Sequence, residues 1–528
     1  MISKKIVIVG GGTAGWMTAA YLAKYRGGEN ITLIESPNIE SIGVGESVTP
    51  HVSNFFDEIG INEFDWMRET GAIHKFANKF INWNGADDEQ YFSFTYTTPS
   101  TNFCKDIAEN KTQDDFTNIT KASRSIDIIS DLFKKGEIDR FDRYFNPQFH
   151  YMERNVAPYL NNEKLLNQPF SHAHHINAEL ASEYIKNKVA KPYGVVHILA
   201  DVINVCTSNK KIDYLELDDN RKIKADLYID CTGLKRLLVN ALNWDVKYYD
   251  SMIDSAWVTH TEYENAKKEM VNYTQSIAEP HGWRFKIGLY HRMGNGYCFS
   301  SNHISNEDAL HYFEKQIGKT RKKPRLLKWK PSRLEKFGEG NCAAIGLSCG
   351  FIEPLEANAL YTIITAIRRL NNVLDSDVLD FTTYNKKMQY TIDDIYDFII
   401  VHYTLSSRND TQFWRDMQEL GMNKNHKELV VNKINNERNT MQSAIKGYTM
   451  FPDYMWAQLA LSWNINLNIT DTPEHLKKLG LNYYNYTKDK HSYISSLCEN
   501  NYEWLSKNVF HRDHKDFNNT IKFNNNRI

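Results

Sequence analysis

A glycine-rich turn between a short strand and a helix constrains this chain more than any other feature. The run Ile-Val-Ile-Val at 6–9 is typical of a buried parallel strand, and a helix is predicted over roughly 14–24. Between them, Gly10, Gly12 and Gly15 satisfy GxGxxG, whose glycines allow a tight turn, close approach of a pyrophosphate and close helix–strand packing. The phosphates would lie at the helix N-terminus, where unpaired N–H groups favour negative charge. The chain is therefore predicted to begin with a dinucleotide-binding unit.

An acid stands where such a unit needs one. A second buried strand, 31–34, ends at Glu35, twenty residues beyond Gly15. A carboxylate at this place accepts hydrogen bonds from ribose hydroxyls and repels a 2′-phosphate. These residues indicate a dinucleotide site but do not distinguish FAD from NAD.

Later segments are predicted to extend this sheet or to build a second one. Strands are expected at 224–230 and 341–347, and the latter leads to a helix over about 359–371. Residues 255–301 contain stretches that alternate apolar and polar residues, which is typical of an antiparallel sheet on the substrate side. The fold class expected is α/β, with a Rossmann-like domain, this second sheet and a mainly helical C-terminal region.

The domain organisation expected from these patterns has three parts. Residues 1–380 form the cofactor-binding core, with 90–175 and 250–335 as substrate-side insertions. Residues 381–506 form a helical region that covers the substrate, and the polar stretch 507–528 is expected to be a loosely held tail.

Bulk properties exclude several classes of protein. A net charge of −2 over 528 residues does not indicate the excess of positive charge with which proteins bind nucleic acid or an anionic membrane. The seven cysteines contain no CxxC pair, which argues against a disulfide framework and favours a reducing compartment. No stretch approaches the roughly 20 apolar residues of a membrane span, and the first strand begins too early for a signal peptide to precede it. We therefore expect a cytoplasmic protein.

Four further segments carry recognisable motifs in chain order. They are GVGESVTP at 43–50, HKFANKFINW at 74–83, WRFKIG at 283–288 and GFIEPLE at 350–356. Together they resemble the flavin-dependent halogenase family, whose best-known members are the tryptophan halogenases. The first is similar to that family's strap around the flavin, the second to its catalytic-lysine segment, the third to its WxWxIP signature and the fourth to its GFxEPLE stretch.

The resemblance implies a flavin-monooxygenase-type FAD domain and a halogenation reaction. Members use reduced FAD, oxygen and halide to make hypohalous acid, which passes through a tunnel to an electron-rich aromatic small molecule. It also implies a separate flavin reductase that supplies FADH2, in keeping with the single GxGxxG unit found here.

The same resemblance assigns two catalytic side chains. Lys75, eight residues before Trp83, matches the essential lysine, and Lys79 is the weaker alternative. An ammonium group can hydrogen-bond hypohalous acid and polarise its O–X bond. Glu356 matches the second catalytic residue, a carboxylate that could accept the arene proton, although it could also serve as a helix N-terminal acid. Glu353 is expected to be structural.

Binding residues follow from the motifs in the same way. Those expected to hold FAD are Gly10, Gly12, Thr13, Ala14, Gly15, Glu35, Gly45, Glu46, Ser47, Val196, Asp230, Gly346 and Leu347. Halide, whether chloride, bromide or iodide, is expected at the backbone of Asn358 and Ala359, where the family has Thr-Gly. The substrate pocket is expected at Phe92, Phe94, Tyr96 and Trp456, for each of which a core role is an open alternative.

Two features leave alternatives open. Phe285 replaces the second Trp of WxWxIP and Gly288 replaces its Pro, and in the family this motif is expected to separate flavin from substrate, so the resemblance does not establish that barrier here. A flavin monooxygenase that does not depend on halide is therefore the main alternative, and a flavin-binding protein without catalysis is the third. His172, His174 and His175 lie close together, but no Cys or carboxylate joins them at ligand spacing, so no metal is expected.

Overall fold

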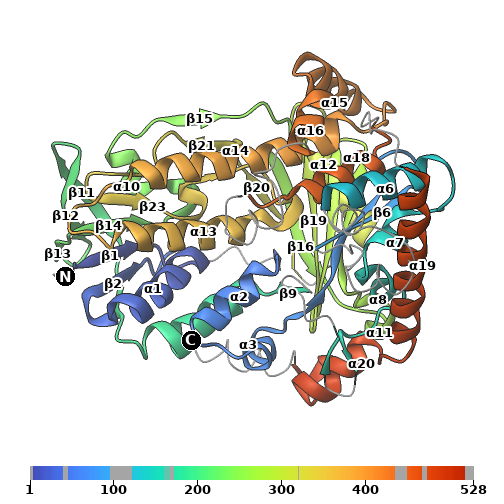
Figure 1. The fold of residues 1–528 in the computed structure, drawn as a ribbon. Coiled ribbons are helices and arrows are strands. Elements are labelled where there is room, and N and C mark those ends of the chain that lie inside the picture. Colours follow the sequence, from blue (N-terminus) through green and yellow to red (C-terminus); the bar gives the residue numbers. More distant parts are fainter. Residues whose placement is uncertain are drawn as a thin grey trace.

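The computed structural model describes residues 4–39, 46–94, 122–160, 163–165, 172–318, 320, 322–434, 449–465 and 473–517. A six-stranded sheet occupies one half of the molecule (Figure 1), in the order β10-β2-β1-β14-β23-β22. Every neighbouring pair is parallel except β22–β23. The strands are β1 (Ile6–Val9), β2 (Ile31–Glu35), β10 (Val196–Leu199), β14 (Leu227–Asp230), β22 (Gly338–Glu339) and β23 (Cys342–Ala344). This is the predicted dinucleotide-binding sheet.

Both faces of this sheet are covered, which explains the uninterrupted apolar run of β1. Ile6 and Ile8 pack toward the helices, whereas Val7 and Val9 pack in a second core with Leu215 of a three-stranded sheet. That small sheet contains β11 (Val202–Ser208), β12 (Lys211–Leu217) and β13 (Lys222–Ile223). The sheet therefore separates a helical layer from a β layer.

The helical layer consists of long helices that pack side by side. It contains α1 (Thr13–Arg26), α9 (Ala178–Ile185), α13 (Asn358–Val373) and α14 (Thr382–Thr404), while the short α10 (Leu237–Ala241) contacts β14. Figure 1 shows α13 and α14 running together across the molecule. Because these two helices pack on each other, the predicted domain division at 380 falls within a continuous layer, and it stays a prediction.

The second sheet confirms the antiparallel pattern seen in the sequence. Its order is β20-β16-β19-β18-β17-β5-β6, and only the β17–β5 pair is parallel. The strands are β5 (Ala77–Ile81), β6 (Glu89–Ser93), β16 (Ser255–Thr261), β17 (Tyr273–Glu279), β18 (Gly282–Leu289), β19 (Arg292–Phe299) and β20 (Arg325–Lys328).

Two further three-stranded sheets contain parts of three of the predicted motifs, in β3, β4 and β24. One has the order β3-β9-β4 and comprises β3 (Glu46–Ser47), β4 (Ile73–Lys75) and β9 (Ala173–Ile176). The other comprises β15 (Val246–Tyr248), β21 (Ser332–Leu334) and β24 (Gly350–Phe351). A two-stranded ribbon, β7 (Tyr159–Leu160) and β8 (Glu163–Lys164), completes the described strands.

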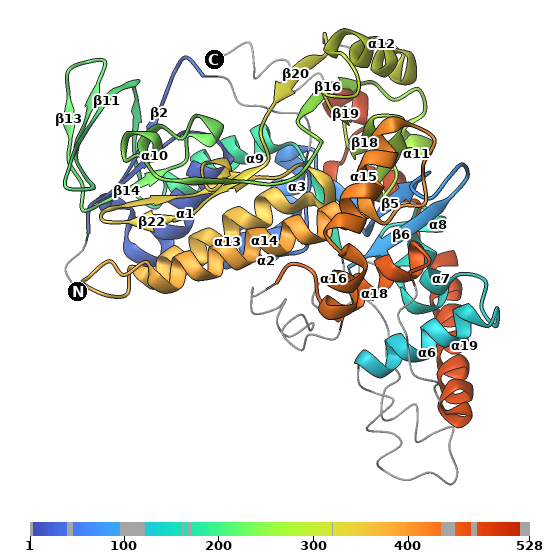
Figure 2. The same ribbon diagram turned by 90° about the horizontal axis from the view of Figure 1, so that it is seen from above.

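The remaining helices lie outside these sheets: α2 packs on α13, α3 packs on α9, and Figure 2 shows α6 and α19 lying together beyond the second sheet. They are α2 (His51–Glu58), α3 (Glu63–Thr70), α6 (Ala122–Lys134), α7 (Phe141–Phe145), α8 (Gln148–Glu153), α11 (Ala266–Glu269), α12 (Asn306–Ile317), α15 (Gln412–Asn423), α16 (His426–Ile434), α18 (Asp453–Ser462), α19 (Glu474–Ser496) and α20 (Asn501–Leu505).

The expectation of a loosely held tail is corrected for residues 507–517. Phe510 stacks on Tyr290 at 3.7 Å between ring centroids, and Phe517 is buried against the same ring. Residues 507–517 are therefore packed, because two aromatic side chains in a polar stretch suffice to anchor it. Residues 518–528 lie outside the described part of the chain.

Candidate functional site

The glycine turn forms an accessible cradle at the N-terminus of α1. Gly10 has φ +117°, and a Cβ at this position would lie 2.3 Å from the carbonyl oxygen of Cys231. A Cβ on Gly15 would lie 1.9 Å from the carbonyl oxygen of Gly10, so both positions exclude a side chain. At Gly12, in contrast, no described atom lies within 4 Å of the Cβ position. The open space lies at the first N–H groups of the helix, so the cradle fits the diphosphate of a dinucleotide.

Glu35 ends β2 beside this cradle. Its carboxylate lies 2.7 Å from His197 Nε2 and 3.6 Å from Lys186 Nζ. Burial by itself would raise the pKa of Glu35, but the hydrogen bond with His197 and the charge of Lys186 lower it. An ionised carboxylate is thus held at the end of the strand where ribose hydroxyls would be recognised.

Gly346 and Leu347 also reach the cradle. They begin the 3-10 turn Gly346–Ser348, where Gly346 has φ +78° and a Cβ would lie 2.7 Å from the Ala14 side chain. The expected strand at 341–347 ends at Ala344 because this turn follows. Thr13 Oγ1 donates to the carbonyl oxygen of Ala178 at 3.5 Å, which links the cradle to α9.

Asp230 lies at the correct end of β14, but its oxygen atoms are occupied by the protein. Oδ1 accepts a 2.9 Å hydrogen bond from Ser348 Oγ, and Oδ2 accepts from the N–H groups of Leu238 and Val239 at 2.8 and 3.0 Å. The fully buried carboxylate therefore caps the N-terminus of α10. Its position fits the prediction, whereas its observed role is structural.

Val196 is not brought to the cradle. It is the first residue of β10, and Leu199 at the other end of that strand is the partner of Glu35. In a parallel sheet the ligand lies beyond the carboxyl ends of the strands. Val196 therefore lies at the wrong end of its strand for the role expected of it.

The predicted flavin strap is only partly described. Glu46 and Ser47 form β3, which pairs with β9, while Gly45 lies outside the described residues. Burial raises the pKa of Glu46 to about 7. Ser47 Oγ lies 2.7 Å from Thr274 Oγ1, which in turn lies 2.9 Å from His175 Nε2. The strap is thereby tied to both the small sheet and the large one.

Lys75 is the last residue of β4, and its side chain is completely buried. Its Nζ donates to the carbonyl oxygen of Val48 at 3.3 Å and lies 5.0 Å from the centroid of the Phe94 ring. Burial lowers the pKa of Lys75 to about 7, although the nearby charge of Glu356 acts in the opposite direction. The structure therefore brings the two predicted catalytic residues close enough to interact electrostatically.

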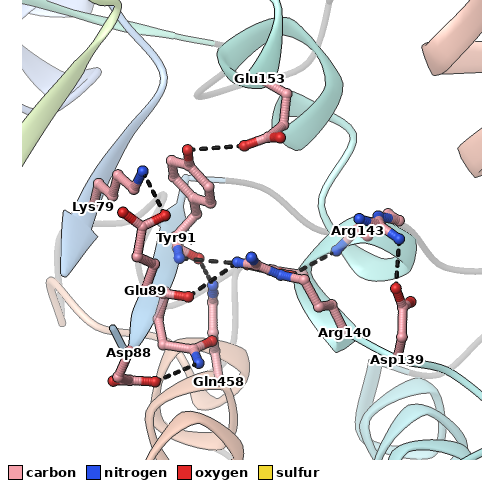
Figure 3. Close-up of polar contacts among 11 residues, drawn as sticks. Lys79, Asp88, Glu89, Tyr91, Asp139, Arg140, Arg143, Glu153 and Gln458 are labelled. Carbon is pink, nitrogen blue, oxygen red and sulfur yellow. Dashed lines mark hydrogen bonds and ion pairs between the residues drawn. The ribbon is translucent and has the colours of Figure 1, made fainter. Parts of the chain in front are cut away.

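Lys79, the weaker alternative, has a different environment. Its Nζ forms a 2.8 Å ion pair with Glu89 and lies 5.1 Å from the centroid of the Tyr91 ring (Figure 3). The preceding residue, Asn78, contacts Glu356 instead, because neighbouring residues of a strand point to opposite faces. Lys79 is thus directed away from the candidate site.

Glu356 is held by two side chains from distant parts of the chain. It adopts φ +64°, a left-handed conformation that costs a non-glycine residue about 1 kcal/mol. Asn78 Nδ2 donates to Oε2 at 2.6 Å, and His402 Nε2 lies 3.4 Å from Oε1. His402 Nδ1 donates to the Phe398 carbonyl oxygen at 2.7 Å. Sequence analysis missed Asn78 and His402, since neither position has a local pattern that indicates contact with Glu356.

A cavity of about 30 Å³ opens at Glu356. Phe94, Pro50, Met450, Phe451 and Met455 contribute to its wall. Lys75 lies behind the Phe94 ring, so that ring separates the amine from the cavity. Among the predicted pocket aromatics, Phe94 is therefore correctly placed.

The other predicted aromatics lie elsewhere. Phe92 packs in the core against His402, with 5.7 Å between ring centroids. Trp456 packs edge-on against Phe398 at 4.8 Å, and its Nε1 donates to the carbonyl oxygen of Phe451. Both support the wall from behind, as their alternative core role required. Tyr96 lies outside the described residues.

The predicted halide residues begin α13. Ala357 is left-handed (φ +56°, ψ +37°) and Asn358 is right-handed helical (φ −79°, ψ −18°). Backbone with such a change of hand can direct successive N–H groups toward one anion. The Asn358 side chain donates to the carbonyl oxygens of Glu353 and Leu355 at 2.9 and 2.8 Å. The Ala357 N–H donates to the carbonyl oxygen of Pro354 at 3.3 Å, so both residues brace the turn, and the halide site at Asn358 and Ala359 stays a prediction.

The degraded WxWxIP segment lies in β18. Trp283 Nε1 donates to Glu353 Oε1 at 3.2 Å, and Tyr403 donates to the same oxygen at 2.6 Å. Burial raises the pKa of Glu353 to about 8, despite these two hydrogen bonds. Phe285, which replaces the second Trp, packs on Gly296, where a Cβ would lie 2.1 Å from the ring. Glu353 thus links the large sheet to the turn before α13.

The histidines set aside in the sequence do have a carboxylate beside them. Glu63 lies 2.9 Å from His172 and 3.1 Å from His174, and His74 joins this group. His175 faces away from it and hydrogen-bonds Thr274. The carboxylate was missed because Glu63 is more than a hundred residues away in the sequence.

No helix in the described ranges has both the length and the apolar character required to cross a membrane.

The family model for tryptophan halogenase matches residues 5–472. Tryptophan 7-halogenase RebH of Lentzea aerocolonigenes is 30% identical over 445 residues, which cover 79% of each chain. Tryptophan 6-halogenase ThaL of Streptomyces albogriseolus is 31% identical over 436 residues, again 79% of each chain.

Solved structures give the same result for the fold. Tryptophan 6-halogenase SttH of Streptomyces toxytricini superposes with a TM-score of 0.82 at 25% identity, covering 96% of this chain and 100% of the other. Xcc4156, a flavin-dependent halogenase of Xanthomonas campestris, gives 0.80 at 26% identity over 96% and 98%. On this evidence the chain belongs to the tryptophan halogenase family of flavin-dependent enzymes.

Proposed function

We propose that this flavin-dependent halogenase acts on electron-rich aromatic small molecules, with Lys75 delivering the electrophile and Glu356 accepting the arene proton. The observation that carries the proposal is the pairing of a buried amine and a buried carboxylate on either side of Phe94, at a cavity. Burying a charged group is costly, so two buried ionisable groups of opposite type near a cavity indicate a functional site.

The residues of the cradle would hold FAD. Gly10, Gly12 and Gly15 accommodate its diphosphate, and Glu35 would accept the ribose hydroxyls. When bound in reduced form, FAD activates oxygen and, with halide, supplies hypohalous acid. Since the chain has a single GxGxxG unit, we assign the reduction of FAD to a separate reductase.

Lys75 is proposed to activate the hypohalous acid. Its ammonium group donates a hydrogen bond to the oxygen and polarises the O–X bond as the arene attacks the halogen. The O–X bond breaks, a new carbon–halogen bond forms, and the oxygen leaves as water after taking a proton from Lys75. Burial strengthens this interaction because little water competes for the ammonium group.

Glu356 and His402 are proposed to remove the remaining proton. Since His402 Nδ1 already donates to a carbonyl oxygen, a neutral His402 would direct an Nε2 lone pair toward Glu356 Oε1. A proton taken from the arene would be shared between these two atoms, which lie 3.4 Å apart. The pair can thus take the proton from the cationic arene and return it to Lys75.

The cavity supports an adaptable aromatic substrate. A volume of about 30 Å³ is well below the roughly 150 Å³ that admits benzene, so a ring must displace side chains of the wall. Met450 and Met455 have flexible side chains suited to such rearrangement. RebH, ThaL and SttH are tryptophan halogenases. We propose a broader set of free indoles and phenols here, with halide held by the backbone N–H groups of Asn358 and Ala359.

The test combines the full chain with FAD, a flavin reductase, NADH and oxygen, and supplies chloride, bromide or iodide to a panel of indoles and phenols. Mass spectrometry should detect halide-dependent products with the mass shift of the halogen supplied. Lys75→Ala should abolish them, whereas Lys79→Ala, which removes only the ion pair with Glu89, should retain most activity. Hydroxylated products formed equally without halide, or wild-type rates in Lys75→Ala, would overturn the proposal.

A further inference from the structure

A cluster of three histidines and one glutamate lies on the reverse face of the strand that carries Lys75. His74 in β4 is the direct cross-strand partner of His174 in β9, and His172 precedes His174 by two residues. Side chains alternate along a strand, so these three imidazoles share one face. Lys75 is directed to the opposite face, with His175 from β9. The cluster is therefore separate from the proposed halogenation site.

Glu63 completes the cluster from the first turn of α3. Its Oε1 lies 2.9 Å from His172 Nε2 and 3.1 Å from His174 Nε2. One ligand atom from each of the four residues, His74 included, lies within 4.8 Å of the other three. Tetrahedral ligands with bonds near 2.0–2.1 Å are about 3.4 Å apart. Small rotations of the side chains would therefore produce a four-coordinate site with three nitrogens and one oxygen.

Two ring nitrogens of this cluster need an explanation. His74 Nε2 and His174 Nε2 are fully buried; the former has no hydrogen-bond partner within the described ranges, and the latter lies 3.1 Å from Glu63 Oε1. Leaving a buried polar atom unsatisfied costs about 1–3 kcal/mol by general experience. Both atoms face the same small volume as Glu63, which is what ligand atoms of one ion would do.

The other atoms of the ligands have partners that orient them. His74 Nδ1 lies 3.0 Å from Asn501 Oδ1, and His174 Nδ1 lies 3.0 Å from Ser53 Oγ. Hydrogen bonds at Nδ1 place the lone pair on Nε2, as second-shell partners of metal-bound histidines do. The outer oxygen of Glu63 lies 3.5 Å from Tyr159 OH and 3.6 Å from Lys164 Nζ.

We propose that Glu63, His74, His172 and His174 bind one divalent transition-metal ion of the zinc class in a structural, four-coordinate site. Imidazole nitrogen with a single carboxylate oxygen suits Zn²⁺ better than Mg²⁺ or Ca²⁺, which prefer oxygen ligands. The ion would tie α3 to the β4–β9 pair directly behind Lys75.

The test uses the full chain after chelator treatment and dialysis. Titration with Zn²⁺, followed by desalting and elemental analysis, should give one equivalent of bound metal and a rise in the melting temperature. Substitution with Co²⁺ should give the intense visible absorption of tetrahedral coordination. A folded wild-type chain that retains no stoichiometric Zn²⁺ or Co²⁺ would overturn the proposal.

Matched variants locate the ion. Glu63→Gln and His174→Ala should each lose the stoichiometric metal, and Asn501→Leu should weaken Zn²⁺ binding about 10- to 100-fold through His74. The control is His303→Ala, which removes a histidine paired with one carboxylate, Asp416, outside the cluster. Circular dichroism confirms that each variant is folded before its metal content is compared. Loss of metal in His303→Ala, or retention in both Glu63→Gln and His174→Ala, contradicts the assignment.

Discussion

The proposed cofactor cradle and the proposed catalytic chamber, which is the buried region around Lys75, Glu356 and His402, are built in opposite ways. The cradle comes from one continuous segment, 10–35, together with the turn at Gly346, and it offers backbone N–H groups and one carboxylate. The chamber combines Lys75 with Glu356 and His402, both of which lie hundreds of residues after Lys75 in the sequence, and it relies on buried side chains. A short continuous segment can therefore specify a phosphate-binding site, whereas bringing a buried amine and a buried carboxylate together requires packing between distant segments.

The largest effect is expected from a substitution of Glu356, which should lower turnover without changing FAD binding. Glu356→Gln keeps the shape and the contact with Asn78 but loses the proton acceptor, so turnover should fall about 10²- to 10⁴-fold. FAD affinity, measured by fluorescence titration, should stay unchanged because the cradle is not altered. A parallel loss of FAD binding would mean that the two regions are not independent.

The second prediction breaks the cradle. Gly15→Ala places a Cβ 1.9 Å from the Gly10 carbonyl oxygen, so it should destabilise the fold by about 1–3 kcal/mol and abolish FAD binding. Gly12→Ala is the matched control, since its Cβ meets no described atom within 4 Å. It should keep the melting temperature and weaken only FAD binding. Equal melting temperatures for both variants would refute the packing argument.

A smaller effect is expected at the support of the carboxylate. Asn78→Leu removes the 2.6 Å hydrogen bond to Glu356 Oε2, a charge-assisted bond worth about 1.5–3 kcal/mol. We expect kcat to fall about tenfold or more with little change in KM, because Asn78 orients Glu356 and does not line the cavity. A change confined to KM would assign Asn78 to substrate binding instead.

The smallest effect is expected at Glu353, which links the large sheet to the turn before α13. Its folded pKa of about 8 lies above the unfolded value near 4.3, so the folded state holds a proton that the unfolded state has lost between these pH values. This contribution to stability is complete below about pH 4.3 and is lost as the pH rises to about 8. The melting temperature of Glu353→Gln relative to wild type should therefore rise from pH 5 to pH 8. A constant difference across that range would exclude a protonated Glu353.

Periodicity and motif spacing predicted much of this molecule. The strands at 6–9 and 31–35, the helix after Gly12 and the approach of Lys75 to Glu356 follow from local patterns and family resemblance. The misplaced residues share a cause. Val196 and Trp456 were assigned from position along the chain, but the end of a strand or the face of a helix that meets a ligand depends on neighbours far away in the sequence.

The sequence by itself determined the β1–α1–β2 unit and the family, because the residues of that unit are close together along the chain and the family motifs are short continuous segments. Only the tertiary structure decided that Asn78 and His402 hold Glu356, that Phe94 covers Lys75, and that Glu63 joins His74 behind it. Burial and contact between distant segments set these side-chain environments, and neither quantity is encoded in any short stretch of residues.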